Sequence, residues 1–116
     1  MLARRVFLTT SLAVLTTAAT AQVFPASLTG TYTAQGRNPD GSAYVGVVRI
    51  EDDGTSLRFK WNIGATSYTG IGSRDGRVVT VDWSADTPVV YVIMEDGNLH
   101  GTWAGGTALE LLVREN

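Results

Sequence analysis

The chain has 116 residues, with nine basic and eleven acidic side chains, a formal net charge of −2 and no cysteine. This balance argues against a nucleic-acid-binding protein, because such proteins gather Lys and Arg against phosphates. Without cysteine there is neither a disulfide nor a thiolate metal site, so a small domain must be stable through packing, for which three Trp, four Tyr and three Phe are available.

Residues 1–21 are typical of a secretory signal peptide. Arg4 and Arg5 precede a modest apolar stretch, and residues 19–21, Ala-Thr-Ala, form a small-residue cleavage site. The apolar part is shorter than the ~20 residues that a bilayer-spanning helix needs, so no membrane span is expected. The paired arginines also resemble a twin-arginine signal, and the general secretory route stays open. Either route predicts an exported bacterial protein, periplasmic or secreted, with residues 22–116 as a single domain.

The mature part alternates apolar and polar residues in short runs. In one run Leu57, Phe59 and Trp61 share a face, and Arg58 and Lys60 take the other. A period of two is typical of a strand with one buried and one solvated side. The pattern predicts eight strands and no helix, with the strands at 28–36, 43–51, 57–63, 66–72, 78–83, 88–94, 99–103 and 109–113.

Short turns join each run to the next, so neighbouring strands are expected to pair antiparallel as a meander. Eight such strands with one apolar face can close into a small up-and-down barrel, which removes the exposed edges. A two-sheet β-sandwich of the same strands is the alternative. Glycines on the inner face would leave room for aromatic rings, and these are Gly30, Gly46, Gly70, Gly72 and Gly101.

The run 88–94 differs from the others because it is apolar on both faces. Val90, Val92 and Met94 are expected to point outward. An exposed apolar face favours a covering partner. We therefore expect a homodimer through these three residues.

The last run carries an acidic residue between apolar ones. Leu109, Leu111 and Val113 are assigned to the inner face, which places Glu110 outside. Asp82 is assigned to the outside of its own strand. Either carboxylate would gain functional interest if it pointed inward.

Several short motifs are spread along the mature chain: Gly30-Thr31-Tyr32, Asn38-Pro39-Asp40-Gly41-Ser42, Tyr44 with Gly46, Trp61-Asn62-Ile63-Gly64, Tyr68-Thr69-Gly70 and Gly97-Asn98-Leu99-His100-Gly101-Thr102-Trp103. Together they resemble a group of small exported bacterial proteins that are often labelled fibronectin-binding protein. The resemblance implies an adhesive role. A more distant resemblance to avidin-type and lipocalin-like meander barrels implies a closed barrel, although the polar spacing of an avidin ligand site is absent.

Residues that could carry catalysis are few. His100 is the only histidine, and it is expected on the outward face of its strand. Nucleophilic catalysis needs a base beside the nucleophile, and a transition-metal site needs several such ligands. Most acidic residues lie in turns, where Asp is favoured for its local hydrogen bonds. We therefore expect no enzyme, no metal and no cofactor.

The aromatic residues of the inner face have two interpretations. They form either a filled core or a ligand pocket at one mouth of the barrel. The candidate ligand-binding residues are Tyr44, Trp61, Tyr68, Trp83, Tyr91 and Trp103. The sequence favours an exported, non-enzymatic binding or interaction module whose partner is an unknown protein or a small apolar ligand. The alternative is a barrel that carries a small molecule in an aromatic pocket.

Overall fold

The computed structural model describes residues 24–115. The predicted signal peptide, residues 1–21, lies outside the described residues. Within residues 24–115 there is no helix that is both long and apolar enough to cross a bilayer.

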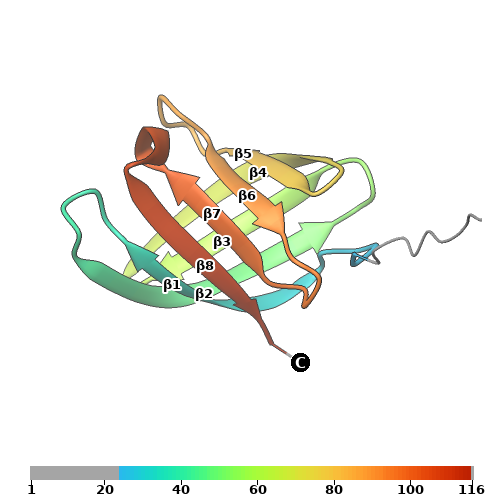
Figure 1. Cartoon of the computed structure of the whole chain (residues 1–116), viewed down its shortest axis with the longest axis horizontal. Helices are drawn as coiled ribbons and strands as arrows, with labels where there is room; N and C mark the ends of the chain where they lie inside the picture. The colour runs from blue at the N-terminus through green and yellow to red at the C-terminus, as the bar shows by residue number, and fades with distance from the viewer. Residues whose placement is uncertain (1–23, 116) are drawn as a thin grey trace, which may run out of the picture.

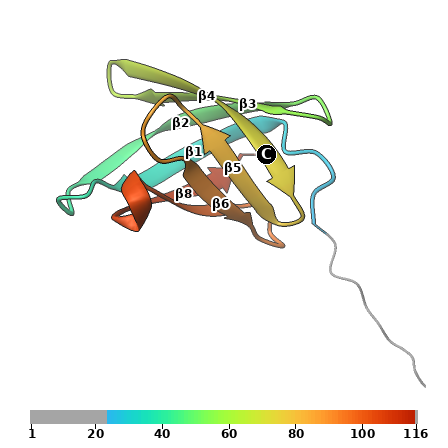
Figure 2. The same cartoon turned by 90° about the horizontal axis from the view of Figure 1, so that it is seen from above.

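Eight antiparallel strands form one closed barrel, and each strand pairs with its neighbours in the chain (Figure 1). The last strand pairs back onto the first, from Tyr32 with Arg114 to Arg37 with Leu109. The sheet therefore curls round on itself (Figure 2), which confirms the meander barrel and not the β-sandwich. The strands are β1 (Gly30–Arg37), β2 (Ala43–Asp52), β3 (Leu57–Ile63), β4 (Thr66–Asp75), β5 (Val78–Asp82), β6 (Val89–Ile93), β7 (Leu99–Trp103) and β8 (Ala108–Arg114).

The predicted alternation holds in most strands. On β3, Leu57, Phe59 and Trp61 are buried, while Arg58 and Lys60 are exposed. Inside the barrel the rings stack on one another. The Phe59 ring lies 5.3 Å from that of Trp61 and 5.6 Å from that of the buried Tyr91. A stacked aromatic core of this kind accounts for a small domain without disulfides.

Strand β8 is the exception, and its predicted faces are wrong by one residue. Ala108, Glu110 and Leu112 point inward and are buried, whereas Leu109 is 54 % exposed. The register is set by a three-residue 3-10 turn, Ala104–Gly106, after which Ala108 pairs with Trp103. The predicted faces are wrong because β8 carries apolar residues on its outer side and its one acidic residue on its inner side.

The outward residues of β6 are less open than predicted. Val92 is exposed, but Val90 and Met94 are half-buried. The Met94 sulfur also accepts a contact from the Arg77 guanidinium at 3.9 Å. The homodimer through this face stays a prediction. Asp82 points outward, as predicted.

The two ends of the barrel differ. The closed end carries the connections at 53–56, 76–77 and 94–98, and residues 24–29, the lead segment, lie against it. The open end carries the connections at 38–42, 64–65, 83–88 and 104–107. In Figure 1 the lead segment, in blue, is on the right, and the β1–β2 connection and the 3-10 turn are on the left.

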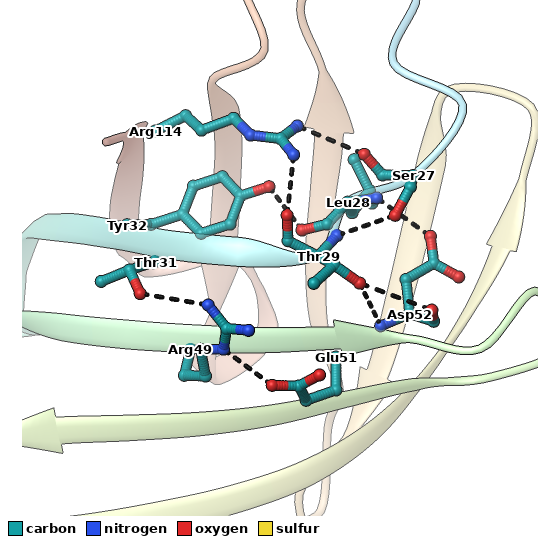
Figure 3. Close-up of polar contacts among 9 residues, drawn as sticks. All are labelled: Ser27, Leu28, Thr29, Thr31, Tyr32, Arg49, Glu51, Asp52 and Arg114. Carbon is teal, nitrogen blue, oxygen red and sulfur yellow. Dashed lines mark hydrogen bonds and ion pairs between the residues drawn. The ribbon is translucent and has the colours of Figure 1, made fainter. Parts of the chain in front are cut away.

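Polar contacts fasten the lead segment across the closed end (Figure 3). Leu28 is fully buried, and its N–H donates to the Asp52 carboxylate at 3.0 Å. The Tyr32 hydroxyl donates to the Leu28 carbonyl at 2.7 Å, and the Arg114 guanidinium donates to the Thr29 carbonyl at 2.8 Å. Burial raises the pKa of Tyr32, so its hydroxyl stays protonated and able to donate. The lead segment thus closes this end of the barrel, and we call it the plug.

Candidate functional site

A pocket of about 210 Å³ opens at the other end of the barrel. Of the six residues predicted to bind a ligand, five line it, and Tyr91 lies buried beneath its floor. The lining residues are Asn38, Tyr44, Trp61, Ile63, Tyr68, Trp83, Val89, Trp103 and Glu110.

The pocket walls are aromatic rings set at steep angles to one another. Trp83 and Trp103 meet at 86°, with their ring centres 5.8 Å apart. Tyr68 meets Trp83 at 69° and 5.9 Å, and Tyr44 meets Trp103 at 65° and 6.3 Å. In each of these contacts the edge of one ring meets the face of another. All four rings also line the pocket, so we call Tyr44, Tyr68, Trp83 and Trp103 the aromatic box. Tyr68, at its rim, is 42 % exposed.

One row of residues that runs across five strands contributes Tyr44 and Glu110 to the pocket lining. Tyr44 pairs with Gly36, and Gly36 pairs with Glu110. On the other side Glu110 pairs with Gly101, and Gly101 pairs with Tyr91. We call Tyr44, Gly36, Glu110, Gly101 and Tyr91 the Glu110 row. It places one carboxyl group between two glycines and, beyond them, two tyrosines.

The two glycines let both tyrosine rings lean over the neighbouring strand toward Glu110. A Cβ on Gly36 would lie 2.0 Å from the Tyr44 ring, and a Cβ on Gly101 would lie 2.4 Å from the Tyr91 ring. A side chain at either position would therefore force the tyrosine ring to move. Glycine is therefore the residue that brings the tyrosine hydroxyls to the carboxyl group.

Glu110 is only 5 % exposed and accepts three hydrogen bonds. Its Oε1 accepts from the Tyr44 hydroxyl at 2.8 Å, and its Oε2 accepts from the Tyr91 hydroxyl at 2.5 Å and the Trp61 indole at 3.1 Å. Short O–H···O contacts are typical of a charged acceptor. Glu110 points inward, and not outward as predicted, because hydrogen-bond donors surround its carboxyl group inside the barrel. A buried acid is tolerated where such donors are present.

Both tyrosines of the Glu110 row are held in their protonated form. Burial, followed by the charge of Glu110 and the hydrogen bond to it, raises the pKa of Tyr44 well above its usual value. The same causes in the same order raise the pKa of Tyr91. The tyrosines therefore act as hydrogen-bond donors to Glu110 and not as bases.

The N–H groups of the three tryptophans are all used within the protein. The Trp61 indole donates to Glu110, the Trp103 indole donates to the Tyr44 hydroxyl at 3.0 Å, and the Trp83 indole donates to the Thr87 carbonyl at 3.0 Å. Trp83 and Trp103 thus offer the pocket ring surface and no hydrogen bonds.

In the part of the chain that the structure describes, no three His, Cys, Asp or Glu side chains gather to hold a metal ion. His100 is exposed on the outer face of β7, as predicted. Comparisons of the chain with protein-family models, curated proteins and solved structures gave no match. The resemblance to fibronectin-binding proteins and to avidin-type barrels therefore stays a prediction.

Proposed function

We propose that this domain is an exported, non-enzymatic binding protein that holds a small molecule in the open end of its barrel. The observation that carries the proposal is the asymmetry of the two ends. The lead segment fills one end, whereas the aromatic box around Trp83 and Trp103 leaves a pocket over a buried carboxyl group. Binding pockets are typically apolar cavities with a few polar groups at fixed positions, and this pocket has that character.

An enzymatic role has little support in this pocket. Glu110 accepts from three donors, and the two tyrosines beside it stay protonated. A general acid or base instead exchanges a proton with the substrate, and its partner groups are arranged for that. The surface-interaction alternative from the sequence would need a partner on the outer face, and it becomes an outcome of the test below.

The test is an NMR screen of the uniformly labelled protein against small fragments grouped as neutral, anionic and cationic. We expect at least one group to shift the indole N–H signals of Trp83 and Trp103 together with the amide of Glu110. The matched variants are Trp103→Leu in the pocket and Leu109→Ala on the outer face. Shifts of the Trp83 and Glu110 signals that vanish in Trp103→Leu and persist in Leu109→Ala support the proposal. If no group shifts these signals, or if the shifts map to the outer face, the proposal is wrong.

A further inference from the structure

Glu110 is a buried carboxylate with no cation beside it. Between residues 24 and 115 the one ion pair is Arg49 with Glu51, on the outer face of β2. Arg74 and Arg114 donate to carbonyls of the lead segment at the opposite end of the barrel. A carboxylate taken out of water costs free energy unless it is paired. The pocket above Glu110 is therefore a place where an added positive charge would be stabilised.

One acceptor position of this carboxylate is left for a ligand. A carboxylate has about four lone-pair positions, two on each oxygen. The Tyr91 hydroxyl and the Trp61 indole occupy both positions of Oε2, whereas the Tyr44 hydroxyl occupies one position of Oε1. Oε1 thus keeps one position, on a residue that lines the pocket.

The remaining lining groups also favour a positive ligand. Trp83 and Trp103 line the pocket and offer it no N–H group, since both indole N–H groups donate elsewhere. The Asn38 amide nitrogen donates to the Ser42 hydroxyl at 3.0 Å and to the Ser42 carbonyl at 3.4 Å, which leaves the amide oxygen as an acceptor. Tyr68 lies at the rim, and its hydroxyl can donate as well as accept. A sugar or an anion would need donors that this pocket largely lacks.

Together these features point to one class of ligand. We infer that the pocket binds a small organic cation, with its charge between the aromatic box and Glu110. An alkylammonium N–H would donate to the free position of Oε1, whereas a quaternary ammonium compound has no N–H and would be attracted by charge alone. Aromatic faces attract such cations through the ring quadrupole, most strongly for Trp. The volume of about 210 Å³ is below the ~300–1,000 Å³ of pockets for drug-sized ligands, so the ligand has few heavy atoms. This inference rests on the proposed function and specifies its ligand.

The experiment compares three probes of one shape and different charge. They are choline, its neutral carbon analogue 3,3-dimethylbutan-1-ol, and the anion 3,3-dimethylbutanoate. Their dissociation constants are measured by tryptophan fluorescence and by the NMR signals named above. We expect choline to bind at least about tenfold more tightly than the alcohol, the size of a desolvated cation–π and ion-pair contribution. The anion is expected to bind more weakly than either.

Variants assign the preference to the pocket. Glu110→Gln keeps the shape of the side chain and removes its charge, and it should bring the choline and alcohol affinities to within about threefold of each other. Glu51→Gln is the matched control, because it changes the net charge equally on the outer face and should leave the preference intact. If Glu110→Gln does not fold, Trp83→Phe and Trp83→Leu replace it, and the choline preference should fall more in the Leu variant.

The outcomes separate this inference from the proposed function. Equal binding of choline and the alcohol in the pocket, or a choline preference that survives in both Glu110→Gln and Trp83→Leu, overturns the cation inference while the binding function stands. Preference for the anion overturns it as well. If none of the probes and none of the fragment groups bind in the pocket, both proposals fall.

Discussion

Tyrosine hydroxyls donate hydrogen bonds at both ends of the barrel, but to different acceptors. At the closed end the Tyr32 hydroxyl donates to a backbone carbonyl, that of Leu28, and the Arg114 guanidinium lies over the Tyr32 ring. At the open end the hydroxyls of Tyr44 and Tyr91 donate to a carboxylate. At the closed end the tyrosine thus provides a hydrogen bond to the segment that closes the barrel. At the open end the tyrosines provide hydrogen bonds to a charged group that lines a pocket.

The difference also separates the charges. Arg74, Arg77 and Arg114 gather around the lead segment, whose Phe24 ring lies 4.8 Å from the Arg77 guanidinium. At the open end Arg37 is exposed and donates to the Gly41 carbonyl in its own turn. The positive side chains thus stabilise the plug and leave Glu110 unneutralised. The segment that closes the barrel and the pocket thus lie at different ends, and we expect that substitutions can alter them separately.

The largest expected effect is at the plug. Leu28→Ala removes a fully buried side chain at the closed end and should lower the free energy of unfolding by about 2–5 kcal/mol. Urea denaturation measures the loss. The matched control is Leu109→Ala, which removes the same atoms from a half-exposed site and should cost well under half as much. Similar losses in both variants would mean that the plug is not part of the cooperative core.

The open end should respond to the loss of a single hydroxyl. Tyr91→Phe removes the 2.5 Å hydrogen bond to Glu110, and hydrogen bonds to charged groups contribute roughly 1.5–3 kcal/mol. Tyr44→Phe should cost less, because Tyr44 is only half-buried and water can replace its hydroxyl. Equilibrium unfolding of both variants checks the order. A larger loss in Tyr44→Phe would contradict the assigned burial of the Glu110 row.

Substitution of the two glycines of the Glu110 row should affect the stability of the fold and the geometry of the site to different extents. Gly101→Ala would press on the fully buried Tyr91 ring and on the Val90 carbonyl at 2.8 Å, so we expect a loss of about 1–3 kcal/mol. Gly36→Ala meets the outer end of the Tyr44 ring, which can swing toward the mouth. It should cost less in stability and still displace the Tyr44 hydroxyl from Glu110. Unfolding free energies and the indole signal of Trp103, which donates to Tyr44, measure the two effects.

Much of this fold could be predicted from local pattern, since strand period and turn residues are local signals. The alternation from Leu57 to Ile63 predicts a strand, and the structure confirms it. The short turns between the runs predict antiparallel neighbours, which the structure also confirms. The lead segment could not be recognised as a plug. Its contacts to Asp52, Arg74 and Arg114 join positions far apart in the chain.

The site was predicted only in part, for a related reason. The aromatic residues were found because bulky rings at inward positions stand out in the alternation. Glu110 was assigned to the outside, because an acid between leucines normally faces water. The hydrogen-bond donors to Glu110 lie on β2, β3 and β6, so the sequence of β8 alone does not indicate them. A usable signal lay in Gly36 and Gly101, which flank Glu110 in the barrel register and lie beside Tyr44 and Tyr91.

The smallest expected effects concern the turns at the two ends of the barrel. They test whether aspartates in these turns contribute equally to stability at both ends. Asp53, in a turn at the closed end, accepts hydrogen bonds from the backbone N–H groups of Ser56 and Thr55, which lower its pKa to about 2 from 3.8. A lowered folded-state pKa means that the ionised form stabilises the fold above about pH 3.8, and that this contribution disappears as the pH falls toward 2. Asp53→Ala should therefore lower the melting temperature slightly at pH 7, and the gap to the unmodified protein should close in acid.

Asp40 provides the matching case at the open end. Hydrogen bonds from the Ser42 hydroxyl at 2.6 Å and the Ser42 N–H at 2.9 Å lower the pKa of Asp40. Both carboxylates are fully exposed, so both effects should be small and screened by salt. Asp40→Ala should thus reproduce the direction and pH dependence of Asp53→Ala. If only one end shows the effect, the turns contribute to the asymmetry; if both do, the difference between the ends lies in the plug and the Glu110 row.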